Sequence, residues 1–508
     1  MSTGSMLLRL LIVLAALVHC AAPATAQGWP FGAGGQGQRG GDYWNLGPLG
    51  AKAETGAVST VAADATGRTS VSGDVPFLDG GPAELVLAVV DPEGPAGRAG
   101  LTVGDVITGI GGKRFKEDES LEALADALVK ARAKGEIELA VEKNGEKSRV
   151  TITLPLGPEV GIVDKDPLSE EARRAAQGFA LRFLAGEQAE DGGLPAGLSG
   201  GTGRVVNASL AGLAWISGGS TLEAGDFAEN LVEAVGFVCA QMEEKMGQEL
   251  PRTDPGVANW DQSNWSLVYA GLFLGEVHAL APSDRVKDVL AFIASDLVLR
   301  QEKSGGYAHG PGGPNALDYI ELNIVGSLAL MAFGAAERAG VEIDEDAVDR
   351  LVEYLDDSSS GGGVGYSTGD GQQGMGNIAR SAATWRGMVL VGRGKDGFAK
   401  QTKNYAKKEA TNFLGGHASL MQHIFFGGIA AAALGGSDLK KWYGAMEREF
   451  VLAQAHDGSY QPRPFQETAN LNSNGDVTMG TAWTTASWAI LLALDFEDGG
   501  LPLMVGAD

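Results

Sequence analysis

Hydrophobic and polar positions follow two different patterns, one before residue 157 and the other after residue 169. The first part contains short apolar runs that are typical of strands: Glu84–Val90, Asp105–Ile110, Glu136–Glu142 and Ser148–Leu154. Glu119–Ala133 instead has the spacing of an amphipathic helix, and Asn144-Gly145 favours a hairpin turn between the last two strands. We therefore expect a small α+β domain over residues 42–157.

One motif in this region resembles a known family. The string VVDPEGPAGRAGL at residues 89–101, followed by GDVI at residues 104–107, is similar to the core motif of PDZ domains. The resemblance implies that a peptide C-terminus adds as a strand beside the second helix, with its carboxylate held by backbone N–H groups of a glycine-containing loop. The loop that best matches consists of Asn45, Leu46, Gly47 and Pro48, although the proline removes one N–H donor. A PDZ fold that serves only as a docking spacer is the alternative.

From Ser169 onward the chain is predicted to be helical and repetitive. The string QAEDGG at residues 188–193 recurs as QEKSGGY at 301–307 and as QAHDGSY at 454–460, with spacings that fit units of about 50–57 residues. A helix with one polar face precedes each loop, as at Asp284–Gln301, and a helix that is apolar nearly all round follows it, as at Leu317–Ala336. Because such apolar helices are normally buried, we expect six outer and six inner helices to alternate over residues 169–508.

This repeat resembles the α/α-toroid of terpenoid cyclases and protein prenyltransferases, whose units end in Q-x-x-D-G-[SG]-[WFY]. The resemblance implies a multidomain protein in which a small PDZ-like α+β domain is joined, through a linker at residues 158–168, to an all-α (α/α)6 toroid. The whole arrangement also resembles a family of secreted bacterial proteins of unknown function. This second resemblance implies no particular activity.

The N-terminal 26 residues are predicted to be an export signal. An apolar run at Leu7–Val18 is followed by Ala24-Thr25-Ala26, which has the small residues that a signal peptidase requires. We expect cleavage near Ala26, export to the periplasm or the extracellular space, and a Gly-rich linker at residues 27–41. No later segment is long enough to span a bilayer. Whether Cys20 is lipidated stays open.

Composition excludes some functions. The 508 residues carry a formal net charge of −25, which argues against nucleic acid as a partner, because phosphate binding needs clustered Lys and Arg. An acidic D-x-D-D run for alkene protonation is missing, since Asp344-Glu345-Asp346 is followed by Ala347. Cys239, on a predicted outer helix, is unsuited to a zinc site in the toroid centre. We expect neither a metal nor a cofactor.

In an alternating toroid, the N-termini of all inner helices open at one end, where free N–H groups and helix dipoles favour anions. Side chains near these termini were therefore chosen as ligand-binding candidates: Arg204, Arg252, Trp260, Trp265, Tyr307, His309, Tyr366, Arg380, Trp385, Tyr460, Arg463 and Trp483. The acid–base candidates are Asp318, Glu321 and His417. Aromatic faces beside charges suit a sugar ligand, here an anionic glycan. The alternative is that the aromatics pack the toroid and the charges cap helices.

These features favour an exported binding or scaffold protein, with a PDZ module for peptide C-termini joined to a ligand-binding toroid. The alternative is a polysaccharide lyase or glycoside hydrolase that acts at the open end of the toroid through paired carboxylates. The sequence leaves undecided whether the protein is an enzyme.

Overall fold

The computed structural model describes residues 43–54, 84–116, 119–132, 134–155, 166, 168–197, 200–250, 262–311, 321–368, 376–412, 419–461, 474–497 and 500–506. The predicted export signal and the Gly-rich linker, residues 1–41, lie outside the described residues. The residues from 40 onward belong to one contact unit.

The first part of the described chain is a β-sheet with short helices. In chain order its elements are β1 (Tyr43–Asn45), the 3₁₀ turn η1 (Gly47–Leu49), β2 (Ala51–Glu54), β3 (Leu85–Val90), α2 (Pro95–Arg98), β4 (Val106–Ile110), β5 (Lys113–Arg114), α3 (Ser120–Arg132), β6 (Glu136–Lys143) and β7 (Glu146–Thr153). The strand order is β1-β2-β3-β4-β6-β7, with β5 paired to β4. Asn144 and Gly145 have φ of 51° and 83° between β6 and β7, as the predicted hairpin turn requires.

Helix α3 supplies the apolar face that covers this sheet. Leu124 and Leu128 of α3 are fully buried and belong to one hydrophobic cluster with Leu139 of β6 and Ile152 of β7. The amphipathic spacing in the sequence therefore corresponds to a helix with one face on a sheet. The PDZ-like α+β domain expected from the sequence is confirmed.

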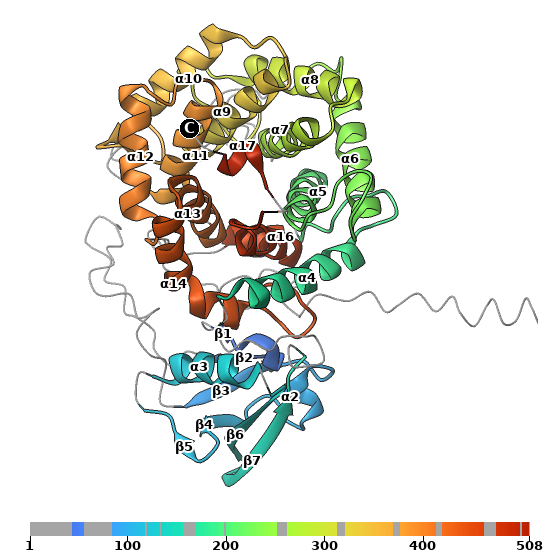
Figure 1. Ribbon diagram of the computed structural model, residues 1–508, viewed down its shortest axis with the longest axis vertical. Helices are drawn as coiled ribbons and strands as arrows, with labels where there is room; N and C mark the ends of the chain where they lie inside the picture. Colours follow the sequence, from blue (N-terminus) through green and yellow to red (C-terminus); the bar gives the residue numbers. More distant parts are fainter. Residues whose placement is uncertain are drawn as a thin grey trace, which may run out of the picture. The chain divides into compact units, whose positions relative to one another are not determined.

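The rest of the described chain forms two concentric sets of helices (Figure 1). The inner helices are α5 (Gly200–Ser217), α7 (Ser263–Leu280), α9 (Asn323–Arg338), α11 (Ile378–Leu390), α13 (Leu420–Leu434) and α16 (Thr481–Leu492). The outer helices are α4 (Glu170–Glu187), α6 (Ala228–Glu243), α8 (Asp284–Arg300), α10 (Glu345–Asp357), α12 (Gly397–Glu409) and α14 (Gly436–Ala453). Each inner helix packs on the next, and α16 packs on α5. The expected toroid is confirmed, although α9 begins at Asn323 rather than at Leu317, which lies outside the described residues.

The glutamine that opens each repeated loop links neighbouring outer helices. Gln301 Nε2 donates to Gly305 O in its own loop at 3.0 Å and to Ala347 O of the next outer helix, α10, at 2.9 Å. Gln188 makes the same two bonds, at 3.0 Å each, to its own loop and to α6. Gln454 reaches Ala176 O at 2.9 Å. Because Ala176 lies in α4, the third glutamine joins the last outer helix to the first.

The glycine of each loop is required for the same contact. Gly192, Gly305 and Gly458 have φ of 85°, 98° and 92°, in the left-handed region that favours glycine. A Cβ on Gly305 would lie 2.4 Å from Arg350 O of α10, and a Cβ on Gly458 would lie 2.6 Å from Phe179 O of α4. The loop backbone therefore lies directly against the next outer helix. Asp191 and Asp457 act as turn residues of these loops, since each carboxylate accepts a hydrogen bond from the backbone N–H two residues later, at 3.1 and 2.9 Å.

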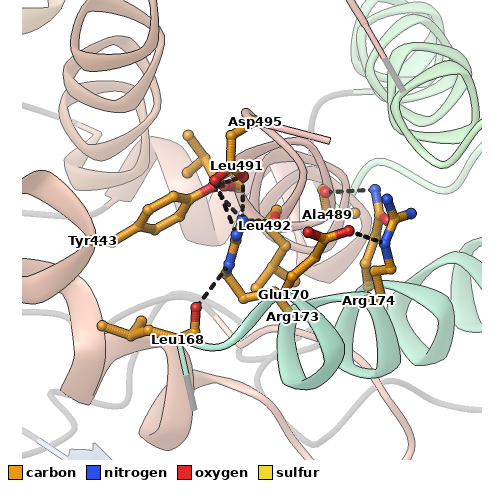
Figure 2. A network of polar contacts seen from close by, with 10 residues as sticks. Leu168, Glu170, Arg173, Arg174, Tyr443, Ala489, Leu491, Leu492 and Asp495 are labelled. Atoms are coloured by element: carbon orange, nitrogen blue, oxygen red, sulfur yellow. Dashed lines mark hydrogen bonds and ion pairs between the residues drawn. The ribbon is translucent and has the colours of Figure 1, made fainter. Parts of the chain in front are cut away.

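Arg173 of α4 adds a second set of contacts at the place where the two ends of the ring meet (Figure 2). Its buried guanidinium donates to Leu492 O at the end of α16 at 2.7 Å, to Asp495 Oδ1 at 2.6 Å and to Tyr443 Oη of α14 at 2.7 Å. It also lies over the Tyr443 ring, 4.4 Å from the centroid. One cation thus holds the first outer helix against the last inner and the last outer helices.

The C-terminal segment lies within the ring of inner helices (Figure 1). Its short helix α17 (Pro502–Val505) contacts α7 and α13. Glu276 Oε1 of α7 accepts the N–H groups of Leu503 and Met504 at 3.0 and 2.8 Å, while Arg386 of α11 donates to Gly506 O at 2.8 Å. Burial raises the pKa of Glu276 to about 7. Two buried side chains of opposite charge thus hold the two ends of this segment.

Gly305→Ala should lower the free energy of unfolding by about 2–4 kcal/mol, because the new Cβ meets the Arg350 carbonyl and the residue keeps a positive φ. Gly444→Ala is the matched control, since Gly444 lies within α14 with open space around it; alanine there should stabilise by about 0.5–1 kcal/mol. Urea titrations of both variants measure the difference. Equal stabilities would contradict the close contact of loop and helix.

Arg173→Ala should lower the free energy of unfolding by about 2–3 kcal/mol, because the buried acceptors Tyr443 Oη of α14 and Leu492 O of α16 lose a charged donor. Arg174→Ala, next along the same helix, removes an exposed pair with Glu170 and should cost less than about 1 kcal/mol. The comparison uses thermal unfolding at neutral pH. A larger effect at Arg174 would show that the ring does not depend on Arg173.

Candidate functional site

The loops between outer and inner helices meet the first turns of the inner helices. Asn264 of α7 donates through Nδ2 to Ala308 O at 2.9 Å and through its backbone N–H to His309 O at 3.1 Å. Asn323 of α9 makes the same pair of bonds to the next loop, at Gly365 O and Tyr366 O, at 2.9 and 3.0 Å. Each of these two asparagines therefore binds the loop that leads into the following inner helix.

Trp265 and His309 are brought together at this end. The indole Nε1 of Trp265 donates to His309 Nδ1 at 2.9 Å, and the two rings lie 6.0 Å apart. Burial lowers the pKa of His309 to about 4. The imidazole is therefore neutral at pH 7 and supplies no positive charge for an anionic ligand.

The described arginines among the ligand-binding candidates, Arg204 and Arg380, are held by contacts within the protein. Arg380 donates through Nε to Val364 O at 3.0 Å and lies over the Tyr366 ring. Burial lowers the pKa of Arg380 to about 10, so it stays charged at neutral pH. Arg204 pairs with Asp191 at 2.6 Å and lies over Phe237. Arg204 thus holds the first repeated loop, and Arg380 holds the loop around β9 (Gly363–Val364).

Most of the described aromatic candidates belong to the toroid core. Tyr307, Trp385 and Tyr460 are fully buried; the Tyr307 hydroxyl donates to Leu297 O at 2.9 Å, and Tyr460 stacks on Trp488. Trp483 is also buried, and its ring contacts Tyr269 of α7 edge-on. These four aromatic side chains are therefore packed inside the protein.

The structure describes one of the three acid–base candidates. Glu321 lies just before α9, and its carboxylate accepts the Ser304 hydroxyl of the second repeated loop at 2.9 Å. The other two, together with three ligand-binding candidates, lie outside the described residues: Asp318, His417, Arg252, Trp260 and Arg463. The geometry therefore does not test an acid–base pair. Among the described residues, no group of three or more His, Cys, Asp and Glu gathers to hold a metal ion.

The sequence analysis missed a buried carboxylate beside these helix starts. Asp476, in the short helix α15 (Asn474–Met479), accepts Ser419 Oγ at 2.5 Å, Met421 N at 3.1 Å and Trp483 Nε1 at 3.0 Å. Burial raises the pKa of Asp476 to about 6 despite these donors. Since Ser419 and Met421 belong to the start of α13, the carboxylate caps α13 and holds it to α16. The segment NSNGD that contains Asp476 has the composition of a loop. Its position just before an inner helix was therefore the only sequence signal that Asp476 could have a special role.

The predicted peptide-binding loop is buried against the toroid. Leu46 and Leu49 are fully buried, and η1 contacts helix α14. Val451 and Leu452, at the end of α14, belong to the hydrophobic cluster of the sheet domain. The apolar space between η1 and α3 therefore holds two aliphatic side chains from the toroid.

Three backbone N–H groups in and just after this loop bond to carbonyl groups nearby in the chain. Leu46 N donates to Ala51 O at 3.0 Å, Leu49 N to Leu46 O at 3.3 Å and Gly50 N to Gly47 O at 3.3 Å. Pro48 has no N–H group to offer. In this conformation these three N–H groups are already hydrogen-bonded within the protein.

Comparisons with known proteins agree with the division of the chain into a PDZ-like domain and a helical toroid. A family model described as PDZ domain matches residues 86–143, which confirms the PDZ resemblance there. The chain is also 31% identical over 170 residues to a probable periplasmic serine endoprotease DegP-like protein of Halomonas elongata. That match covers 34% of this chain and one third (33%) of the relative.

A second family model, described as a domain of unknown function (DUF6288), matches residues 237–494, about half of the chain. The chain belongs to the DUF6288 family. The matched residues of this DUF6288 protein run from within α6 to the end of α16 and contain most of the toroid. None of the helices in the described ranges is long and apolar enough to cross a membrane.

Two solved structures resemble the DUF6288 toroid in fold. A type II terpene cyclase from Scytonema, in complex with merosterolic acid A, aligns with a TM-score of 0.41 at 14% identity over 66% of this chain and 98% of that chain. A family 76 glycoside hydrolase from a bovine Bacteroides thetaiotaomicron strain aligns with a TM-score of 0.40 at 10% identity over 71% and 83%. No chemistry of the DUF6288 protein is inferred from them.

The stability of the toroid should depend on pH through Asp476. Because its pKa is raised on folding, from 3.8 to about 6, the native state binds the extra proton, and stability falls as pH rises from about 4 to 6. Asp476→Asn should remove that slope, measured as the difference between the unfolding free energies of wild type and variant over this range.

Asp191→Asn is the control, because the contribution of Asp191 to stability should change with pH in the opposite direction. The Arg204 hydrogen bond lowers the pKa of Asp191, so its contribution is present at neutral pH and is lost as pH falls below about 4. A wild-type minus variant difference that rises with pH for Asp476 would contradict a buried, proton-binding carboxylate there.

Proposed function

We propose that this protein is a binding scaffold whose PDZ module docks aliphatic peptide ends and whose toroid carries that module. The observation that supports the proposal is the occupancy of the space between η1 and α3 by Val451 and Leu452. A pocket that buries a valine and a leucine has the apolar lining that an aliphatic terminal residue needs. Peptide capture at this place is also what the PDZ resemblance implies.

The contacts of the open end of the toroid support a scaffold role for this part. Its described charged groups, Arg204, Arg380 and Glu321, are bonded to loop residues, and His309 is neutral at pH 7. Such groups fix loops on helices and keep the toroid rigid. Polysaccharide cleavage has no specific contact among the described residues in its favour.

Export is part of the proposal. The apolar run and the small residues before Ala26 support a cleaved signal, and the DegP-like relative is itself a probable periplasmic protein. A periplasmic or extracellular scaffold meets peptide ends that proteolysis leaves behind. Intact mass of the exported protein measures whether cleavage occurs near Ala26.

The test is fluorescence anisotropy with a labelled ten-residue peptide that ends in Val-Leu and a free carboxylate. The control is the same peptide with an amidated end. Both are titrated with the full chain and with Leu452→Asn, in which the apolar side chain from α14 is lost from the pocket. We expect Leu452→Asn to bind the free acid at least about tenfold tighter than the amide. Equal binding of both peptides, or no binding by either protein, would refute peptide capture.

A further inference from the structure

The end of α14 is part of the PDZ module's core rather than of the toroid's core. Val451 and Leu452 are 1% and 8% exposed, and both belong to the cluster that contains Leu46, Leu49 and Leu128. The neighbouring Phe450 belongs to the toroid cluster. Helix α14 therefore has one face on the ring and a final turn that inserts into the other domain.

Backbone contact reinforces this insertion. An ideal Cβ on Gly47 would lie 2.5 Å from Val451 O, so only glycine allows η1 to approach the last turn of α14. Gly47 has φ of 57°, which also favours glycine. The glycine that the sequence analysis assigned to a carboxylate loop thus serves as the contact point for α14.

Charged residues surround the apolar centre. Arg448 of α14 forms an ion pair with Glu122 of α3, and His456 Nε2 lies 3.1 Å from Asp91 Oδ2. His456 belongs to the third repeated loop, two residues after Gln454. An apolar centre with a polar rim is the usual composition of a specific protein interface.

Acidic residues lie close to Glu447, the neighbour of Arg448 in the chain. Burial raises the pKa of Glu447, and the charges of Asp166 and Asp126 raise it further. Asp126 lies on α3, one turn from Glu122. Arg448 therefore neutralises an acidic zone between the two domains, and a negative charge at position 448 would make the two sides repel each other.

The strand that would receive a peptide is already paired on both sides. Strand β2 pairs with β3 through Ala51 and Val90 and with β1 through Lys52 and Asn45. A peptide that adds to β2 must therefore displace β1. Together with the hydrogen-bonded N–H groups of the loop, this arrangement closes the module to a free peptide.

We propose that the end of α14 is an internal occupant of the PDZ pocket, and that a peptide with a terminal aliphatic residue binds only by displacing it. This proposal rests on the proposed function. The protein then has a docked form, in which Val451 and Leu452 fill the pocket and β1 pairs with β2, and an open form, in which both are displaced and peptide binds. The apparent affinity for peptide is the intrinsic affinity reduced by the fraction of open protein.

The test compares three full-length variants with wild type. Arg448→Glu replaces the ion pair with repulsion and should favour the open form. Arg448→Glu combined with Glu122→Arg restores an ion pair of reversed polarity and should return the protein toward the docked form. Lys441→Glu, an exposed charge reversal on the same helix, controls for the change in net charge.

Hydrogen exchange measures docking without any ligand. In Arg448→Glu the amide hydrogens of residues 46–50 and 120–132 should exchange at least about tenfold faster than in wild type, while those of α5 and α7 stay protected. The charge-swapped double variant and Lys441→Glu should behave as wild type does. Unchanged exchange in Arg448→Glu, or faster exchange throughout the toroid, would overturn the docked form as a separate state.

Peptide anisotropy on the same proteins measures gating. Arg448→Glu should bind the Val-Leu peptide acid at least about tenfold tighter than wild type, and the double variant should lose that gain. Equal, carboxylate-dependent binding by all four proteins would overturn the gate but leave peptide capture intact. A third outcome is faster exchange in Arg448→Glu with no peptide binding by any of the four proteins. It would overturn peptide capture, and with it the displacement of α14 by peptide, while the contact between α14 and the PDZ module would stand.

Discussion

The toroid depends on one hydrogen-bonding pattern, the glutamine amide that binds its own loop and the next outer helix. Helix pairs joined only through apolar faces can slide, because burial of apolar surface has little directionality. The amide of Gln301 fixes the distance between α8 and α10, and the glycine at position 305 brings the loop close enough for that bond. At Gln454 the same pattern joins the end of the chain's last outer helix to its first. Ring closure is thus built from a local motif.

Ring closure and docking of the PDZ domain share one segment. Helix α14 and the loop after it carry Gln454, which binds α4, and also Leu452 and His456, which contact the PDZ domain. The Tyr443 hydroxyl of the same helix accepts a hydrogen bond from the Arg173 guanidinium. A displacement of the PDZ domain therefore acts on the part of the ring where its two ends meet. This shared segment gives the two domains a physical route for coupling.

The groups chosen as a ligand site and those that hold the toroid together are largely the same, and there is a physical reason. The starts of inner helices need hydrogen-bond acceptors and caps, and the gaps between helix ends need large side chains. Aromatic, basic and acidic residues meet these needs, so their local enrichment does not separate structure from binding. Trp265 with His309 and Trp483 with Asp476 are examples: each is a hydrogen-bonded pair between a helix and a neighbouring segment.

The sequence by itself determined the PDZ-like domain, the alternation of outer and inner helices and the hairpin turn at Asn144-Gly145, because each of these follows from local periodicity or turn chemistry. It did not reveal the buried Asp476, whose partners Ser419 and Met421 lie more than fifty residues away in the chain. Nor did it reveal that Gly47 meets Val451, or that Glu276 and Arg386 hold the C-terminal segment. Those contacts join segments that are distant in sequence, and only the closed ring brings them together.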